Sequence, residues 1–327
     1  MSGSCSLGWT ISSQEDVDSI SNELIECTQF PFLLLENATG KITFPETFFP
    51  ETYGPVNITV TESDALESLN ITGFCGVQYL DMFDLSIIEG LYLPNTPNNE
   101  CQEANLAIRI QEHLKDPKDV FPHNLHIHNA PPFTELVIEY NTPRSMVFRD
   151  ITEAKKLTIS NAITYFPALK TASSVSLLSD TDKYDSEIFK NLSQVASIDI
   201  AGVGYEFLLD YDFEVWDDMT ITSFSHDPQY GFMLDENGKE LDSLRIPSIG
   251  KDLIVRDGSN VPLSFTNLTT IGANLVFADS RNCSLSFRDL TEVPAIWMSN
   301  NTNTTLPGNM NKLEFANDIY LNGYIDT

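Results

Sequence analysis

The sequence predicts an all-β fold: a right-handed parallel β-helix, or leucine-rich-repeat-like solenoid, with a short N-terminal capping helix. A unit that reads Phe-x-x-Leu, two spacers, a small or aliphatic residue, two spacers and an apolar-x-apolar strand recurs along the chain. Adjoining units begin at Phe148, Phe166 and Phe189, which are 18 and 23 residues apart. Repetition at this period is typical of stacked coils, because a single coil is too small to bury its own apolar side chains.

Residues 1–30 are expected to form an N-terminal cap that a disulfide bond holds together. Ser12 and Glu15 have the spacing of a capping box, and Val17 and Ile20 follow at helical spacing. A helix at this place would lie over the open end of the solenoid. Such a cap is needed because the terminal coil would otherwise expose the apolar core to water.

Residues 31–327 are expected to form the repeated coils of one solenoid, in a single structural domain with the cap. Leu253-x-Val255 and Leu275-x-Phe277 are typical of its strands. Because side chains alternate along a strand, the apolar pair faces the core and the residue between them faces outward. Asn, Asp or Gly follows many of these strands by two positions, as a sharp corner requires.

A second repeat supports the same fold. Ser248–Asp257 and Thr270–Asp279 match in register, 22 residues apart, and both have Ile-Gly at their second and third positions. Compared with the leucine-rich repeat, the Asn or Asp comes one residue earlier and no coil offers a helical stretch, which favours a β-helix. Residues 203–247 are less regular and are expected to form one or two irregular coils that carry a loop.

The charge of the chain argues against two classes of partner. It contains 47 acidic and 18 basic side chains, for a net charge of -29. Nucleic acid and anionic membrane surfaces would both be repelled. No run of 18 apolar residues is present, so we expect no transmembrane span.

The cysteines indicate an oxidising compartment. Cys5 and Cys27 bracket a short segment and Cys75 and Cys101 bracket another, so we expect two disulfide bonds. Cys283 remains outside this pairing. It is expected to be a shielded thiol rather than a nucleophile, because no histidine is near it in the sequence.

Asn-x-Ser/Thr sequons also indicate passage through a secretory pathway. We therefore expect an extracellular glycoprotein from a eukaryote. A leader is expected to have been removed from its N-terminus, and a C-terminal anchor signal is removed in the same way. The eight sequons are at Asn37, Asn57, Asn70, Asn191, Asn267, Asn282, Asn300 and Asn303.

These features together resemble the fungal Ecm33/Sps2 family of GPI-anchored cell-surface and cell-wall glycoproteins. The resemblance rests on the cap between Cys5 and Cys27, on the L-x-x-I-G-x-x-L-x-I rungs and on the sequons, and it covers essentially the whole chain. It implies an architecture similar to receptor L-domains and a role in cell-wall organisation. It also implies a place in the cell wall or at the outer face of the plasma membrane, with membrane contact only through a removed GPI anchor.

A carbohydrate-active β-helix enzyme, a glycosidase or a lyase, is the first alternative. Such enzymes use clustered carboxylates on adjacent coils together with basic residues. Asp217 and Asp218 are the one tempting pair, and no histidine or arginine motif accompanies them. We therefore expect a protein that is not an enzyme, with no catalytic residue.

His123, His126 and His128 form the one histidine cluster of the sequence. On a strand that begins at Leu125, His126 and His128 would face outward together and offer two imidazole ligands to a metal. A third ligand is not evident in the sequence. We therefore expect no metal and no cofactor.

The outward face of the strands is the better candidate for function. Exposed apolar patches mark sites for partners, and aromatic rings suit the surfaces of sugars and proteins. The alternative is that a neighbouring loop or a removed C-terminal segment covers this part of the face. The central outward residues of four successive C-terminal strands, hereafter the outer stripe, are Ile254, Val276, Trp297 and Tyr320.

Together with the resemblance, the sequence predicts a non-enzymatic fungal cell-surface or cell-wall glycoprotein that acts as a structural or ligand-binding module. Its partner would be a cell-wall polysaccharide or a cell-surface protein. A receptor-like domain that binds a peptide or a neighbouring cell is a further alternative.

Overall fold

The structure is a computed structural model. The chain forms two compact units, Met1–Leu169 and Lys170–Thr327, called here the N-terminal unit and the C-terminal unit. The residues described are 8–24, 32–44, 56–72, 74, 77–83, 88–93, 107–111, 125–128, 133–139, 145–149, 151–160, 163–178, 189–202, 213–223, 243–260, 262–304 and 312–322.

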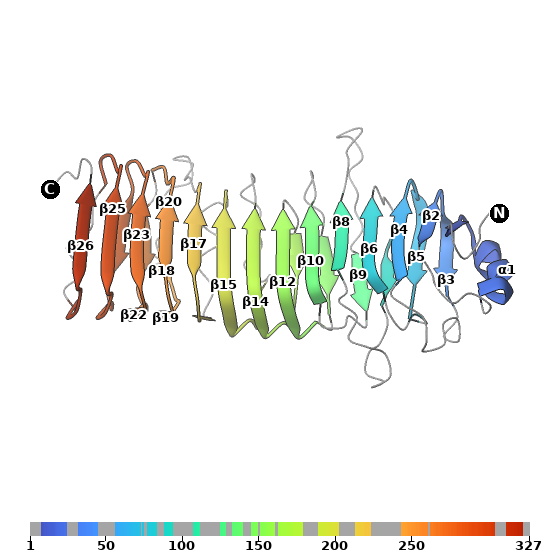
Figure 1. Cartoon of the computed structure of the whole chain (residues 1–327), viewed down its shortest axis with the longest axis horizontal. Helices are drawn as coiled ribbons and strands as arrows, with labels where there is room; N and C mark the ends of the chain where they lie inside the picture. The colour runs from blue at the N-terminus through green and yellow to red at the C-terminus, as the bar shows by residue number, and fades with distance from the viewer. Residues whose placement is uncertain are drawn as a thin grey trace, which may run out of the picture. The chain divides into compact units, whose positions relative to one another are not determined.

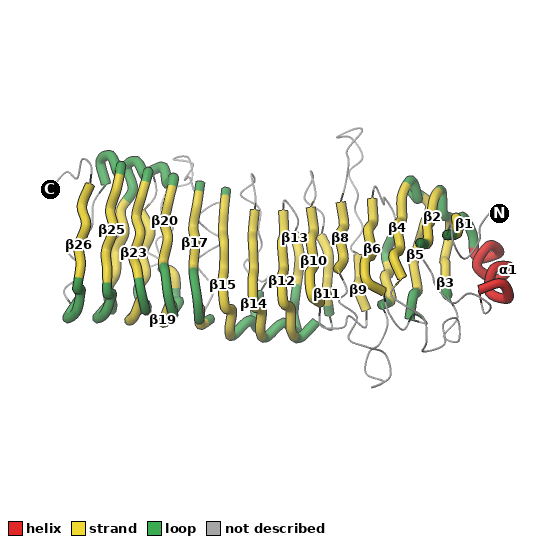
Figure 2. Tube along the Cα trace, in the orientation of Figure 1, coloured by secondary structure: helices red, strands yellow, loops and turns green. Residues whose placement is uncertain are grey.

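Both units consist of short strands, and the described residues contain a single helix (Figures 1 and 2). The elements of the N-terminal unit are β1 (Trp9–Ile11), α1 (Gln14–Leu24), β2 (Leu33–Glu36), β3 (Thr39–Thr43), β4 (Val56–Thr61), β5 (Ala65–Asn70), β6 (Val77–Phe83), β7 (Gly90–Tyr92), β8 (Ala107–Gln111), β9 (Leu125–His128), β10 (Phe133–Glu139), β11 (Ser145–Phe148), β12 (Glu153–Ser160) and β13 (Ile163–Tyr165). Those of the C-terminal unit are β14 (Thr171–Leu178), β15 (Gln194–Ala201), β16 (Glu214–Val215), β17 (Met219–Thr222), β18 (Ser243–Leu244), β19 (Ser248–Ile249), β20 (Leu253–Arg256), β21 (Pro262–Phe265), β22 (Thr270–Ile271), β23 (Asn274–Ala278), β24 (Ser284–Phe287), β25 (Ala295–Ser299) and β26 (Asp318–Asn322).

Strands pair in parallel with strands about one coil further along the chain. In the N-terminal unit, β1, β2, β4, β6, β8, β10 and β12 form one ladder, and β3, β5, β7, β9, β11 and β13 form another. In the C-terminal unit, the long ladder is β14, β15, β17, β20, β23, β25 and β26. Two shorter ladders are β16, β19 and β22, and β18, β21 and β24.

Each unit is therefore a parallel β-solenoid, and the predicted fold class is confirmed. That residues 31–327 form one domain around a continuous core stays a prediction.

The core of each unit consists of the residues that alternate inward on these strands. In the long C-terminal ladder, Leu253, Leu275 and Ile296 lie in register on successive strands and are at most 2% exposed. On β21 and β24, the rings of Phe265 and Phe287 stack with their centroids 5.2 Å apart. Burying one such side chain is worth about 1.5–3 kcal/mol, so each added coil gains stability only through its contact with the next.

Helix α1 covers the first coil of the N-terminal unit, as the sequence predicts. Val17 and Ile20 are fully buried. The side-chain amide of Gln14 donates to the main-chain oxygen of Thr43 at 3.0 Å and accepts from its main-chain nitrogen at 2.7 Å. The helix therefore closes both the apolar core and part of the strand edge at this end.

The capping box predicted at Ser12 and Glu15 is wrong by one residue. The hydroxyl of Ser13 accepts from the main-chain nitrogen of Asp16 at 3.3 Å, and Asp16 Oδ2 accepts from the nitrogen of Ser13 at 3.0 Å. Asp16 Oδ2 also accepts from the main-chain nitrogen and the hydroxyl of Ser12, both at 2.8 Å. The hydrogen bond from the Ser12 main chain is the main reason why the pKa of Asp16 is lowered.

Sharp corners follow the strands at residues with left-handed backbone. Asp257, Asp279 and Asn300 come directly after β20, β23 and β25 and have φ of 54°, 53° and 54°. Asp and Asn adopt this conformation at lower cost than other residues that carry a side chain. The predicted corner positions are confirmed at these three places.

Buried side chains satisfy the main-chain groups that these corners leave inside. The hydroxyl of Ser280 accepts from the nitrogen of Gly258 at 3.1 Å, and Asn301 Oδ1 accepts from the nitrogen of Ser280 at 3.0 Å. Asn301 Nδ2 donates to the oxygen of Phe277 at 2.8 Å. Without these partners, buried main-chain groups would destabilise the corner.

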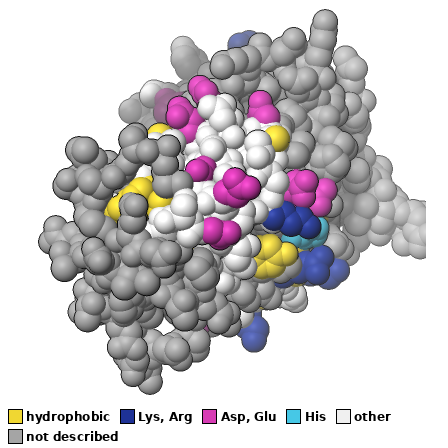
Figure 3. All heavy atoms as spheres, turned by 90° about the vertical axis from the view of Figure 1, so that its right-hand side faces the viewer, with side chains coloured by type: hydrophobic (Ala, Val, Ile, Leu, Met, Phe, Trp, Pro, Cys, Tyr) yellow, Lys and Arg dark blue, Asp and Glu magenta, His cyan; other side chains and the backbone are white. Residues whose placement is uncertain are grey.

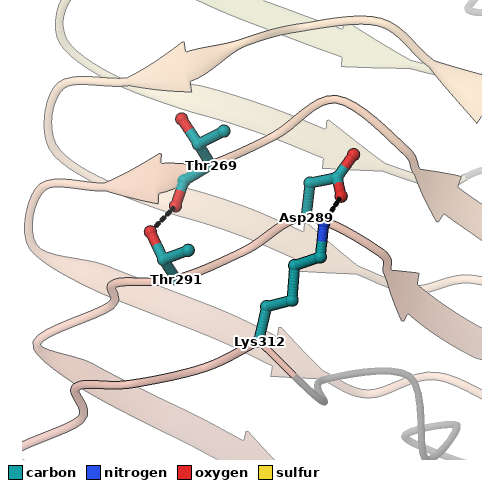
Figure 4. Close-up of polar contacts among 4 residues, drawn as sticks. All are labelled: Thr269, Asp289, Thr291 and Lys312. Atoms are coloured by element: carbon teal, nitrogen blue, oxygen red, sulfur yellow. Dashed lines mark hydrogen bonds and ion pairs between the residues drawn. The ribbon is translucent and has the colours of Figure 1, made fainter.

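Further polar contacts join successive coils at the surface. The hydroxyls of Thr269 and Thr291 donate to the main-chain oxygens of Pro247 and Thr269, both at 3.0 Å. Figure 4 shows the second of these contacts, and beside it Lys312 Nζ lies 2.6 Å from Asp289 Oδ1. This ion pair lowers the pKa of Asp289.

Part of the region 203–247, predicted to be irregular, is regular. Within it, β16 and β17 continue the parallel pairing with β15. Residues 203–212 and 224–242 lie outside the described residues.

Candidate functional site

The outer stripe is a single row of side chains on the C-terminal unit. The strands β20, β23, β25 and β26 pair so that Ile254, Val276, Trp297 and Tyr320 are neighbours in that order. Trp297 is 44% exposed and Tyr320 is 45% exposed, while Ile254 and Val276 are half-buried. In the described part of the chain, no loop covers the two rings.

The rings of Trp297 and Tyr320 stack on one another. Their centroids are 3.9 Å apart and their planes differ by 16°. Each ring therefore covers one face of the other, and a partner can contact their outer edges and the second face of Tyr320. Stacking also holds both rings in place, which lowers the entropy that a partner must remove on binding.

The same row continues on the earlier strands with polar side chains. Thr220, Asp199 and Ser176 precede Ile254 in register on β17, β15 and β14. Burial raises the pKa of the Asp199 carboxyl. The row therefore joins hydrogen-bonding groups to an apolar and aromatic segment, a combination that binding sites for extended ligands use.

The two carboxylates that suggested catalysis hold different groups of the next coil. Asp217 Oδ1 lies 2.8 Å from Lys251 Nζ. Asp218 Oδ1 accepts from the main-chain nitrogen of Asp252 at 3.2 Å, and Asp252 Oδ1 does the same for Asn274 at 2.9 Å. The contact between Asp218 and Asp252 is thus one step of a repeated link between coils.

Two of the three clustered histidines are described, and both lie on β9. His126 is in register with Gly90 on one side and Val147 on the other, and His128 is in register with Tyr92. His123 lies outside the described residues. Across the ranges described, no group of three or more His, Cys, Asp or Glu side chains could hold a metal ion.

Most of the sequon asparagines are open to solvent. Asn57 and Asn70 are half-buried, and Asn70 Oδ1 accepts from the hydroxyl of Thr72 at 2.7 Å. Asn282 Nδ2 donates to Asn260 at 2.8 Å, and Asn303 Nδ2 donates to Asn282 Oδ1 at 2.7 Å. Glycosylation stays a prediction at all eight sites. The exposed ones are Asn37, Asn191, Asn267, Asn282, Asn300 and Asn303.

The predicted shielding of Cys283 is confirmed, because this residue is 3% exposed and its thiol donates to the main-chain oxygen of Arg281 at 3.3 Å. The four cysteines of the predicted disulfide bonds, Cys5, Cys27, Cys75 and Cys101, lie outside the described residues.

Two exposed features were missed in the sequence. Trp216 is 56% exposed at the end of β16, where no repeat pattern marks it. Ile319 and Leu321 were expected in the core, yet they are 58% and 59% exposed. The apolar pattern places them inward correctly, but it does not indicate that no strand of the described residues follows β26 in the ladder.

None of the described helical segments has the length and apolar character that crossing a bilayer requires. Comparison with known protein families, curated proteins and solved structures found no match.

Proposed function

We propose that this protein is a non-enzymatic extracellular surface module that binds a cell-wall polysaccharide through the outer stripe. The observation that carries the proposal is the row itself, in which two stacked and exposed aromatic rings continue an aligned apolar and polar edge. Successive side chains of the row are spaced by the strand separation, about 4.8 Å. A linear polymer with many hydroxyl groups can follow such a row.

Three further features support an extracellular, non-enzymatic role. Six of the eight sequon asparagines are exposed. The carboxylates of Asp217 and Asp218 are engaged by Lys251 and by the next coil. The net charge of -29 favours a neutral polymer over a polyanion.

A role in cell-wall organisation, with GPI anchoring in a longer precursor, extends this proposal through the resemblance to the Ecm33/Sps2 family. A cell-surface protein in place of the polysaccharide is an outcome that a glycan array and a pull-down separate when they are run together.

The test is a glycan array, run beside a pull-down from wall extract, on the wild-type chain and three variants. We expect Trp297→Ala and Tyr320→Ala to weaken binding at least about tenfold, as truncation of an aromatic anchor does. Trp216→Ala is the matched control, since it removes an equally exposed tryptophan of the same unit outside the stripe.

Equal binding by all four proteins would refute the role of the stripe. Cleavage of a wall polysaccharide by the wild type that is lost in Asp217→Asn would replace the proposal with an enzyme.

A further inference from the structure

The last strand of the C-terminal unit exposes its core-facing side. Ile319 and Leu321 on β26 are in register with Ile296 and Met298 on β25, which are both 2% exposed. The side chains of Ile319 and Leu321 are nevertheless 58% and 59% exposed, and Phe315 beside them is 46% exposed. The apolar core of this unit therefore reaches solvent at β26.

The strand edge is open as well. β26 pairs with β25 on one side, and within the described ranges no strand continues the ladder on the other. An apolar edge strand without Lys or Pro is a ready template for pairing with another chain.

The opposite kind of end, in the N-terminal unit, is closed. Helix α1 buries Val17 and Ile20 there, and Gln14 occupies both main-chain groups of Thr43. Figure 3, which faces this end, shows acidic side chains spread over the described surface and only small hydrophobic areas. A second copy therefore cannot add its β26 to this end, so head-to-tail joining of copies is blocked.

The sequence of β26 suits pairing with itself. In an antiparallel pair centred on Tyr320, Ile319 lies opposite Leu321 of the second copy, and Asp318 lies opposite Asn322 of the second copy. Both apolar side chains stay on the core side, and the two Asp318 carboxylates are kept apart. Opposed like charges, which would destabilise a pair of strands, are thus avoided.

The aromatic stack fits the same arrangement. Trp297 covers one face of Tyr320, and the second face of that ring is directed away from β25. A twofold axis normal to the sheet would bring the two Tyr320 rings together, so that Trp297 and Tyr320 of both copies form one stack.

We propose that two copies of this chain join end to end through antiparallel pairing of β26 about a twofold axis at Tyr320. The contact is isologous and closes after two copies, as in most homodimers. It is independent of the proposed function, since it requires no polysaccharide. The net charge of -29 on each copy opposes association, so added salt strengthens it.

The first test is sedimentation of the purified chain over about a hundredfold range of concentration, because association makes the apparent mass depend on concentration. We expect a monomer–dimer equilibrium in the wild type that shifts toward dimer with salt. Leu321→Asp should weaken the dimer at least about tenfold, and Trp216→Asp, an equally exposed control elsewhere in the unit, should leave it unchanged. Both residues are exposed, so neither change removes a buried contact.

The second test locates the axis. Under mild oxidation, Tyr320→Cys should form a disulfide-linked dimer, because directly opposed residues lie about 4.5–5.5 Å apart between Cα atoms. Asp318→Cys alone should not, since the two copies of that position are about 13 Å apart along the strands. An equal mixture of Asp318→Cys and Asn322→Cys should cross-link, with the wild-type chain showing the background of the native cysteines.

A monomer at every concentration and salt level would overturn the proposal. So would a dimer that Leu321→Asp leaves intact, or one in which Asp318→Cys links as well as Tyr320→Cys. Loss of polysaccharide binding with the dimer intact would count against the proposed function alone.

Discussion

A Cβ atom on Gly272 would lie 1.9 Å from the main-chain oxygen of Gly250, one coil earlier. Gly250 stands in the same relation to Trp216, where the distance is 1.7 Å. Main chains of successive coils approach too closely here for any side chain. This contact explains why Ile-Gly recurs at a spacing of 22 residues.

Gly272→Ala is therefore expected to destabilise the C-terminal unit by about 1–3 kcal/mol, the usual cost of forcing atoms into a packed contact. Denaturant unfolding measures the change. Ala273→Ser, a half-buried neighbour, should stay within about 0.5 kcal/mol of the wild type. If Gly272→Ala were as stable as this control, the coils would have to be spaced more widely than described.

Thr291→Val tests the hydroxyl contacts between coils. The substitution keeps the shape of the side chain but removes the hydrogen bond to the oxygen of Thr269. We expect a loss of about 1 kcal/mol in the free energy of unfolding. Thr220→Val, on the outward row of β17, should cost less, because a β-branched apolar residue suits a strand. Equal losses for the two variants would show that the hydroxyl contact has no special part in stacking.

Asp16→Ala tests the helix cap at two pH values. The pKa of Asp16 is lowered below its ordinary value of 3.8, so its stabilisation is fully present above that value and fades as the pH falls through the lowered pKa. At neutral pH we expect the variant to lose about 1 kcal/mol, with a smaller loss for Glu15→Ala. In strong acid the wild type and Asp16→Ala should unfold alike, and a difference that persisted there would rule out the carboxylate as the cause.

Asp199→Asn should have the opposite sign. Burial raises the pKa of Asp199 above 3.8, so the ionised carboxylate destabilises the fold at neutral pH. We expect the variant to be as stable as the wild type or slightly more stable there. As the pH falls through the raised pKa toward 3.8, the wild type should regain stability and the two proteins converge. A marked loss in the variant at neutral pH would mean that Asp199 makes a favourable interaction as an anion.

The sequence predicts the fold well because its determinants are local. Apolar pairs such as Leu253 and Val255, followed by Asp257 at a left-handed corner, specify a strand and its turn within a few residues. The row from Ile254 to Tyr320 was also predictable, because matching coils place matching residues in register.

Other features depend on contacts that no periodic pattern encodes. The exposure of Leu321 depends on whether another strand packs against β26, and that of Trp216 depends on the short strand before it. The correct N-cap, Ser13, could not be chosen over Ser12 by spacing alone, because both precede an acidic residue by three positions. Tertiary contacts decided each of these cases.

The hydroxyl contact between Thr269 and Thr291 spans 22 residues, and so do those between Asp252 and Asn274 and between Asn260 and Asn282. The chain is therefore interchangeable along this stretch in steps of that length. Removing one such step would give each surviving residue a neighbour equivalent to the one it lost, whereas a deletion of any other size would misalign every later rung. Natural variation in length should consequently occur here in whole turns.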